Sequence, residues 1–236
     1  MGGLSVRTPP TDQTRRPMDF LTTRETTPPR HDGHSLRSGY RGKRVLDMSI
    51  AAVGFLPAGA MGAICAVGIR LEDGGPIFFH QMRIGLNGRP FTVWKLRTMT
   101  HKGSQNSLFP DPDRITVVGA VLRRFSLDEL PQLINVVRGD MSIVGPRPTL
   151  PYQVARYDDR QRGRLAVRPG ITGLAQLRGR NSITWAQRIE HDLEYCERQS
   201  LWLDVKIILR TAIAVTSGRG AIGHPPDDPL AASPGG

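Results

Sequence analysis

The longest apolar run lies near the N-terminus, where no charged residue occurs from Met48 to Ile69. As a helix rising about 1.5 Å per residue, such a run could just cross a hydrocarbon core of about 30 Å. Its composition argues against a straight crossing, because several glycines and Pro57 interrupt it. A proline inside a helix removes a backbone hydrogen bond and forces a kink. The pattern therefore predicts a membrane segment that changes direction near its centre.

Basic residues flank this run on both sides. Arg41, Lys43 and Arg44 precede it and Arg70 follows it. Since basic flanks favour the cytoplasmic side, both ends should stay on the same face of the membrane. We predict a re-entrant helical hairpin over residues 41–72 that breaks near Leu56 and Pro57. A single crossing is the alternative.

Asp47 lies one helical turn after Lys43 and Arg44. On a helix the three side chains share a face, so an ion pair at the membrane boundary would fix the depth of insertion. Ordinary pairing on a helix surface explains the same spacing.

The pattern changes to short extended segments after residue 73. PIFF predicts a strand, NGRP a turn, and FTVWKLRTM a second strand with Lys95 and Arg97 on one face. Gln81, Arg83, Lys95 and Arg97 would then converge as phosphate-binding donors, unless all four are solvated strand residues. Residues 100–113 are rich in Ser, Asn, Asp and Pro and predict a loop.

Helical patterns dominate the remainder. Residues 115–124 predict a helix that ends in Arg123 and Arg124, and two amphipathic helices are predicted from Trp185 onward. Their apolar stripes suit a protein core, although Trp202, Lys206 and Arg210 also permit a helix at the membrane interface. The chain is thus predicted to be α+β, with a re-entrant membrane helix, short β-strands and amphipathic interfacial helices.

Both ends of the chain lack apolar periodicity. Residues 1–40 are basic and rich in proline, and residues 221–236 are rich in Gly and Pro, so both are predicted to be disordered tails. The N-terminal tail does not resemble a secretory signal, because the apolar run begins too late. The catalytic part is predicted to span residues 73–220.

The overall charge narrows the class of partner. The chain of 236 residues has a formal net charge of +11, which points to phosphate-rich partners such as nucleotides, nucleic acid or anionic lipid. Aromatic residues make up only 6% and do not alternate with basic runs, so no nucleic-acid partner is expected. Cys65 and Cys196 occur in unlike surroundings and indicate neither a disulfide framework nor a metal site.

Two adjacent carboxylates, Asp128 and Glu129, stand in the segment FSLDELPQL. Neighbouring carboxylates disfavour each other's ionisation, so this arrangement needs a compensating role. Ser126 and Glu129 have the spacing of a capping box, which would make Glu129 a mere cap of the helix DELPQLINVVRG. A cap does not explain Asp128 or the preceding Arg123 and Arg124, whereas a phosphate with a divalent cation would use all of them.

Two further arginines lie in stiff or tight segments. Arg147 stands between Pro146 and Pro148, which suits the presentation of a guanidinium group to a phosphate or nucleobase, although a structural turn is equally compatible. Arg168 precedes the segment PGITG, which predicts a tight loop with free N–H groups that could bind an anion.

Together these motifs closely resemble the bacterial monotopic phosphoglycosyl transferases, the small type that consists of the catalytic domain alone. The resemblance runs from about Lys43 to Arg219 and is carried by KRVLD before the apolar run, GPIFFHQMRIG, KLRTM, LRRFSLDELPQLINVVRGDMSIVGPRP and RPGITGLAQLRGRN. It implies transfer of a sugar 1-phosphate from a UDP-sugar to undecaprenyl phosphate, with release of UMP. It also implies a protein of the cytoplasmic (inner) membrane, inserted in one leaflet, with its active site on the cytoplasmic face.

The resemblance also assigns roles to residues. Asp128 is implied to be the nucleophile that takes up the phosphosugar, and Glu129 to support Mg²⁺ and the nucleophile. Arg147 and Arg168 match positions associated with nucleotide or phosphate binding. The membrane-boundary group is matched by Lys43, Arg44 and Asp47, with Pro57 at the break.

Two positions depart from the family pattern. Leu56 stands where many members have Ser before Pro57, and Thr149 stands where many have Glu after the Pro-Arg-Pro motif. The alternative to the enzyme is a non-catalytic, basic membrane-surface protein in which Asp128 and Glu129 only cap a helix.

Overall fold

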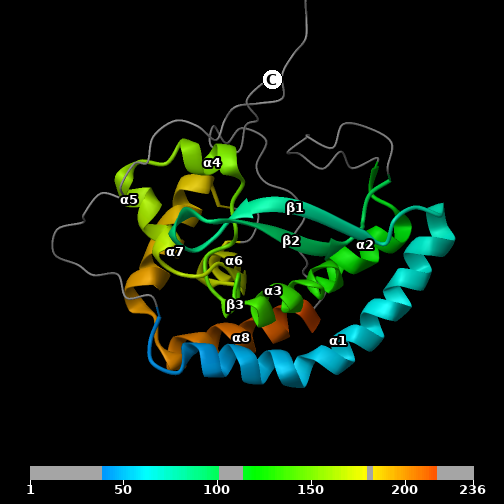
Figure 1. The fold of residues 1–236 in the computed structure, drawn as a ribbon, viewed down its shortest axis with the longest axis horizontal. Coiled ribbons are helices and arrows are strands. Elements are labelled where there is room, and N and C mark those ends of the chain that lie inside the picture. The colour runs from blue at the N-terminus through cyan, green and yellow to red at the C-terminus, as the bar shows by residue number, and fades with distance from the viewer. Residues whose placement is uncertain (1–38, 101–113, 180–182, 217–236) are drawn as a thin grey trace, which may run out of the picture. The chain divides into compact units, whose positions relative to one another are not determined.

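The computed structural model describes residues 39–100, 114–179 and 183–216, which form a mixed helical and stranded fold with two small sheets (Figure 1). The predicted tails, residues 1–40 and 221–236, and the predicted loop, residues 100–113, lie almost wholly outside the described residues.

The first element is the long apolar helix α1, Lys43–Asp73. Within the described residues it is the one helix long and apolar enough to cross a membrane. It remains a single helix through Pro57, so the predicted break into two helices is not shown. Its axis instead bends along its length, from the lower edge of the fold up one side (Figure 1), as a proline inside a helix favours.

The hairpin predicted after this helix is confirmed. Strand β1, Phe78–Ile84, pairs antiparallel with β2, Pro90–Leu96, in a register that places Phe79 opposite Lys95 and Arg83 opposite Phe91. Because residues directly opposite each other lie on one face, Gln81, Arg83 and Lys95 share that face of the sheet.

The acidic pair lies between two helices and does not lie within one. Helix α2, Val117–Arg124, is followed by a 3₁₀ turn, Leu127–Glu129, and then by α3, Gln132–Arg138. The alternative that Ser126 and Glu129 form a capping box is wrong, because Ser126 has a left-handed backbone (φ 54°) and its side chain makes no capping hydrogen bond.

A short parallel sheet supports the two arginine segments. Strand β3, Ser142–Val144, pairs with β4, Gly170–Thr172. The connection contains α4, Pro151–Ala155, α5, Asp159–Arg162, and the 3₁₀ turn Gly163–Ala166. The segment after Arg168, predicted to be a tight loop with free N–H groups, contains strand β4, and its Gly170 N–H is not free because it donates to the Pro146 carbonyl (2.8 Å).

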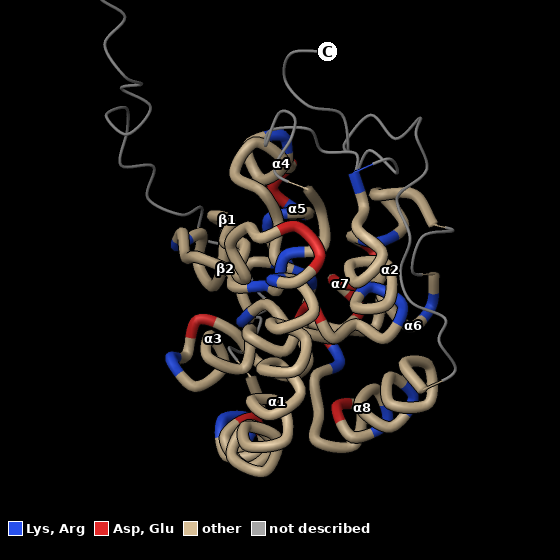
Figure 2. Tube along the Cα trace, turned by 90° about the vertical axis from the view of Figure 1, so that its right-hand side faces the viewer, with Lys and Arg blue, Asp and Glu red and all other residues tan. Residues whose placement is uncertain are grey.

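Three helices complete the fold: α6, Leu174–Arg178, α7, Trp185–Arg198, and α8, Leu201–Thr216. Helix α8 lies beside the N-terminal part of α1 in both ribbon and tube views (Figures 1 and 2). The main core joins Ala51 of α1 and Ile207 of α8 to Val136, Met141 and Tyr195. The amphipathic pattern predicted for the C-terminal helices therefore serves partly as core.

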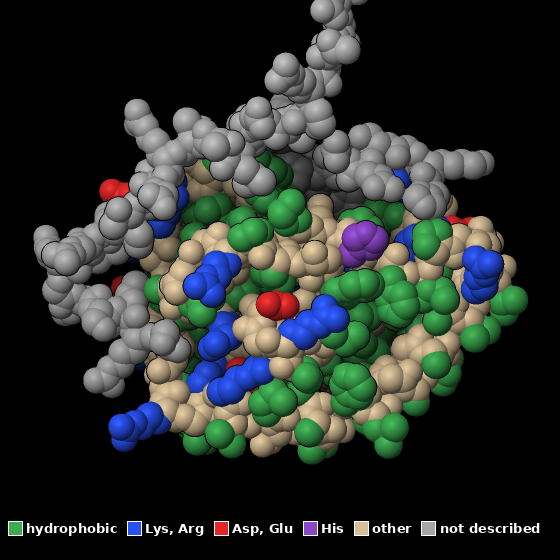
Figure 3. Space-filling view, viewed as in Figure 1, with side chains coloured by type: hydrophobic (Ala, Val, Ile, Leu, Met, Phe, Trp, Pro, Cys, Tyr) green, Lys and Arg blue, Asp and Glu red, His purple; other side chains and the backbone are tan. Residues whose placement is uncertain are grey.

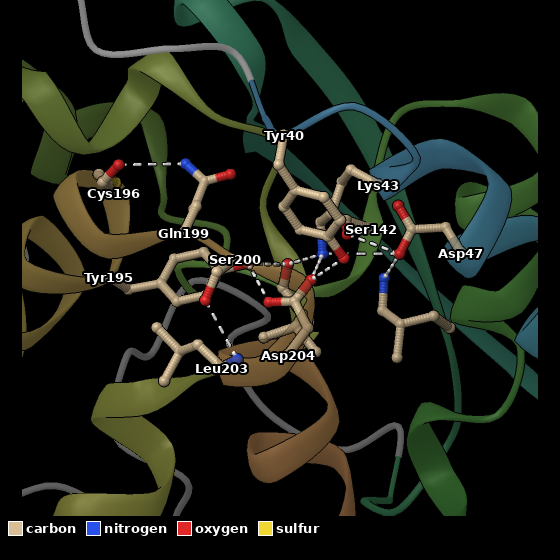
Figure 4. A network of polar contacts seen from close by, with 12 residues as sticks. Tyr40, Lys43, Asp47, Ser142, Tyr195, Cys196, Gln199, Ser200, Leu203 and Asp204 are labelled. Atoms are coloured by element: carbon tan, nitrogen blue, oxygen red, sulfur yellow. Dashed lines mark hydrogen bonds and ion pairs between the residues drawn. The ribbon is translucent and has the colours of Figure 1, made fainter.

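A buried polar cluster attaches the start of α1 to α8 (Figure 4). Asp204 is fully buried and accepts hydrogen bonds from Lys43 (2.6 Å), Tyr40 (3.0 Å) and Tyr195 (2.8 Å). Burial is the largest cause that raises the pKa of the Tyr195 hydroxyl, followed by the Asp204 carboxylate. Such a satisfied network fixes how the two helices meet.

The outer side of α1 is strongly apolar. Large exposed apolar side chains occur along its whole length: Val45, Met48, Val53, Phe55, Leu56, Met61, Ile64, Val67 and Leu71. Hydrophobic side chains also project along the lower and right-hand edges of the molecule, where α1 runs (Figure 3). An exposed apolar surface of this extent indicates a membrane or protein partner.

Candidate functional site

The site is built on the 3₁₀ turn that carries Asp128 and Glu129 side by side. Asp128 is buried and Glu129 is nearly so. The turn follows the left-handed Ser126, and non-glycine residues adopt this conformation at an energetic cost that is frequent at functional sites. The adjacent acids are thus held by a constrained turn that packs against α2 and β2.

Two cations contact the acidic pair directly. The Lys95 ammonium of β2 lies 2.9 Å from Glu129 Oε1 and 3.4 Å from Asp128 Oδ2. Arg147 Nη2, from the loop after β3, donates to Glu129 Oε1 at 2.8 Å. Glu129 therefore receives two charge-assisted hydrogen bonds, and Asp128 shares one of the two donors.

These surroundings separate the two carboxylates electrostatically. Burial raises the pKa of Asp128 above its usual value, and the neighbouring Glu129 adds to this although Lys95 opposes it. Burial also disfavours ionised Glu129, but Arg147 and Lys95 outweigh it and lower its pKa to about 2. Glu129 is thus ionised at neutral pH, while Asp128 is the less stabilised carboxylate of the pair.

Two more of the predicted cations, Arg83 and Arg123, lie near this pair, and Gln81 binds one of them. Arg83 donates to the Pro148 carbonyl (3.2 Å) and to Gln81 Oε1 (2.6 Å), and burial followed by the nearby Arg147 lowers its pKa to about 10. Arg123 donates through Nε to Thr98 Oγ1 (2.8 Å), and burial lowers its pKa although Asp128 opposes this. The site therefore has more cations than acids before any substrate binds.

The other three predicted arginines have different partners. Arg97 forms an ion pair with Asp73 at the end of α1. Arg124 lies over the Phe125 ring and is exposed. Arg168 Nε donates to the Gly139 carbonyl (2.9 Å) at the end of α3. In this structure none of the three contacts Asp128 or Glu129, so any role in substrate binding stays a prediction.

The loop that carries Arg147 rests on residues that the sequence analysis did not identify. Arg164 is fully buried and donates to the Arg147 carbonyl (3.0 Å), to the Tyr157 hydroxyl (2.5 Å) and to Asp192. The same loop needs a glycine at position 145, because a Cβ atom on this residue would clash with the backbone carbonyl of Arg168. The sequence offers no signal for Arg164, because a buried arginine is recognisable only through its tertiary partners.

The residues predicted at the membrane boundary hold α1 to the rest of the fold. Lys43 lies 3.7 Å from Asp47, which is buried and accepts hydrogen bonds from the Ser142 hydroxyl (2.8 Å) and the Ile143 N–H (3.0 Å). Arg44 binds the carbonyls of Val136 and Val137 and does not bind Asp47. The predicted pair of Lys43 and Asp47 therefore exists, but inside the protein.

The acidic pair fits a magnesium ion only together with a phosphate ligand. Among the described residues no cluster of three or more Asp, Glu, His or Cys side chains could hold a metal alone. Asp128 Oδ1 and Glu129 Oε2 accept no hydrogen bond from the part of the chain that the structure describes. Mg²⁺ commonly binds one or two carboxylates and completes its shell with water and substrate phosphates. The donor set fits that pattern.

Comparison with known proteins identifies relatives over most of the chain. The model of the family described as bacterial sugar transferase matches residues 39–218. An uncharacterised sugar transferase, EpsL of Bacillus subtilis, is 47% identical over 64% of this chain and 76% of its own length. The exopolysaccharide production protein ExoY of Rhizobium meliloti is 39% identical over 78% of this chain and 89% of its own.

A third relative has a name that states a reaction. The UDP-glucose:undecaprenyl-phosphate glucose-1-phosphate transferase of Caulobacter vibrioides is 45% identical over 72% of this chain and 67% of its own length. The residues that the family model matches, 39–218, include the acidic pair and its surrounding cations.

Proposed function

The chain belongs to the bacterial sugar transferase family, and on this premise we propose that it transfers a sugar 1-phosphate from a UDP-sugar to a polyprenyl phosphate, undecaprenyl phosphate, at the membrane. The observation that carries the proposal is the buried pair of Asp128 and Glu129, held by Lys95 and Arg147. A relative named for this reaction with UDP-glucose supports the substrate class. A non-catalytic helix cap is disfavoured, since neither Ser126 nor Glu129 caps α3.

Asp128 is proposed to act as the nucleophile. One of its carboxylate oxygens attacks the β-phosphorus of the UDP-sugar, the bond from that phosphorus to the bridging oxygen breaks, and UMP leaves. An oxygen of the polyprenyl phosphate then attacks the same phosphorus, which releases the lipid diphosphosugar and restores the Asp128 carboxylate. Since both partners are bulky, two successive displacements let one site accept them in turn.

The neighbouring residues have complementary roles in this scheme. Glu129 stays ionised and holds its two cations, Lys95 and Arg147, at the place where the diphosphate must bind. Arg83 lies near Glu129 and Arg123 lies near Asp128, so both add positive charge to the site. Mg²⁺, bound by Asp128 and Glu129, would neutralise negative charge on the diphosphate.

The attachment of α1 supports insertion into one leaflet. Its start binds β3 and α8 through Asp47 and Lys43, and its end binds α2 through Glu72, which accepts the N–H groups of Val117 (2.6 Å) and Val118 (3.0 Å). Both ends therefore belong to the same charged body, while the apolar middle is exposed. A straight crossing would place the ends on opposite faces of the membrane, so we propose the re-entrant arrangement, with the active site on the cytoplasmic face of the inner membrane.

The reaction is tested by measuring UMP released from a panel of UDP-sugars in the presence of undecaprenyl phosphate and Mg²⁺. We expect Asp128→Asn to abolish release and Asp159→Asn, the same change at an exposed acid of α5, to leave it unchanged. The panel also identifies the sugar. Turnover by Asp128→Asn at the unaltered rate would refute the assignment.

A further inference from the structure

A groove of about 580 Å³ lies between α6, the end of α7 and α8, on a side of the fold that the proposed chemistry does not use. Figure 2 shows α6 and α8 one above the other on the same side of the fold. The volume of the groove is in the range of sites that bind a small molecule or a lipid headgroup. It is lined by Leu174, Leu177, Arg178, Glu194, Arg198, Ser200, Trp202, Leu203, Lys206, Ile207, Arg210 and Ala214.

The charged lining of this groove is strongly unbalanced. Four cations line it with one carboxylate, Glu194, and that carboxylate is already shared by Arg178 and Arg198. Lys206 and Arg210 are exposed, and among the described residues neither forms a hydrogen bond or ion pair with another side chain. Like charges one helical turn apart destabilise a helix, so this pair favours an anion from outside the chain.

The rest of the lining is apolar. Leu174, Leu177, Leu203 and Ile207 form the floor between the two helices. A free inorganic anion would leave this apolar surface in contact with water, whereas a ligand with both a phosphate and hydrocarbon would cover it.

The groove opens beside the apolar surface of α8. Leu201, Leu209 and Ile213 of that helix are large, apolar and more than half exposed, and Trp202 at the groove is 75% exposed. Helix α8 lies against α1, whose outer side is the proposed membrane surface. Tryptophan beside lysine and arginine is typical of the membrane interface, where one end of a site is apolar and the other hydrated.

We propose that this groove binds the headgroup of an anionic glycerophospholipid. The phosphate lies between Arg178, Lys206 and Arg210, and the acyl chains leave the groove past Trp202 into the bilayer. The site uses the membrane position of the protein but not its transferase chemistry, and therefore its test is a lipid-binding measurement without substrates.

The test measures quenching of tryptophan fluorescence by brominated lipid. The full chain is reconstituted in phosphatidylcholine bilayers that contain a minor fraction of phosphatidylglycerol. In one set the bromine is on the chains of the phosphatidylglycerol, and in the other it is on the chains of an equal fraction of the phosphatidylcholine. Trp202→Phe gives the background from Trp94 and Trp185. We expect brominated phosphatidylglycerol to quench Trp202 more strongly, by a preference of roughly fivefold for each unpaired cation.

Charge-neutral variants separate the groove from the overall charge. Lys206→Gln/Arg210→Gln should abolish the preference, while Arg89→Gln/Arg162→Gln, an equal change of charge at exposed sites of the β1–β2 turn and α5, should retain it. Unchanged circular dichroism and melting show that each variant is folded, and the single variants serve if the double variant is not.

Three results of the quenching measurement would overturn the proposal. They are equal quenching by both lipids, a preference that survives in the groove variant, and a preference lost equally in the control. A fall in oligomer mass in the groove variant, with no lipid preference in the parent, would assign the groove to a second copy of the chain and also overturn it.

Discussion

Asp128 and Glu129 are neighbours in the chain, but their environments give them different ionisation. Glu129 receives both Lys95 and Arg147, whereas Asp128 is buried with only a longer contact to Lys95. Consequently the carboxylate with the weaker stabilisation is the one proposed as nucleophile, and the better stabilised one fixes the cations. A pair of acids with separated pKa values permits such a division of roles.

The residue-scale prediction concerns pH. Asp128 attacks as a carboxylate, and since burial raises its pKa, its inactive protonated form persists to higher pH than for an ordinary aspartate. The rate constant kcat/KM should therefore fall as the pH drops through this raised pKa. Lys95 lowers the pKa of Asp128, so Lys95→Gln should move the acid limb of the pH profile of kcat/KM to higher pH. The same change should lower the rate at neutral pH on the order of 100-fold.

UMP release measured against pH at one Mg²⁺ concentration checks this shift. Lys95→Arg keeps the positive charge and should keep the limb close to its original position. A limb that moves to lower pH in Lys95→Gln would show that Lys95 does not stabilise ionised Asp128.

At the scale of elements, the site depends on segments that meet only in the folded chain. The 3₁₀ turn supplies the acids, β2 supplies Lys95, and the loop after β3 supplies Arg147. That loop is in turn held by Arg164, which connects it to Asp192 of α7. The position of Arg147 thus depends on a helix that contacts neither acid.

The element-scale prediction concerns this connection. Arg164→Gln removes the ion-pair partner of the buried Asp192 carboxylate, so the free energy of unfolding should fall by about 3–5 kcal/mol. Arg160→Gln, which breaks an exposed pair with Glu190, should leave the free energy of unfolding nearly unchanged. Denaturant unfolding in detergent measures both.

A second variant separates stability from positioning. Arg164→Met/Asp192→Leu removes both buried charges and should recover most of the lost stability, yet kcat/KM should remain low because the Arg147 carbonyl has lost its donor. Full recovery of activity together with stability would show that Arg164 has a structural role only.

The local features of the fold could be predicted from the sequence, and the structure shows why the tertiary contacts of the site could not. The hairpin and the amphipathic helices follow from periods of two and 3.6 residues, which need no tertiary information. The spacing of a capping box at Ser126 and Glu129 was misleading because Ser126 adopts a left-handed backbone, which a serine gives no reason to expect. Arg97 and Arg168 were grouped with the site, but their partners, Asp73 and the Gly139 carbonyl, are fixed by packing of distant segments.

At the scale of the whole molecule, the distribution of polar and apolar contacts along α1 decides how the protein meets the membrane. Both ends are held by buried or charged contacts to one body, and the middle exposes side chains such as Phe55 and Leu56. A straight helix of this length would be about 46 Å long, more than enough to cross a bilayer. The bend and the two attachments favour a helix that enters and leaves by the same face.

The whole-molecule prediction is therefore one of topology. Single cysteines placed in tags at the N-terminus and at the C-terminus, with Cys65 and Cys196 replaced, should both resist an impermeant thiol reagent in intact cells and react after lysis. A periplasmic cysteine of a known membrane protein confirms that the reagent works. Labelling of the N-terminal tag alone in intact cells would establish a single crossing instead.

The central claim is that Asp128 carries the phosphosugar between the two substrates. The most direct test is peptide mass spectrometry of the protein after incubation with its UDP-sugar and Mg²⁺ but without polyprenyl phosphate. We predict a mass increase equal to one sugar phosphate on the peptide at Asp128, which disappears when polyprenyl phosphate is added and is absent in Asp128→Asn. An adduct on another residue, or full turnover by Asp128→Asn, would contradict the account.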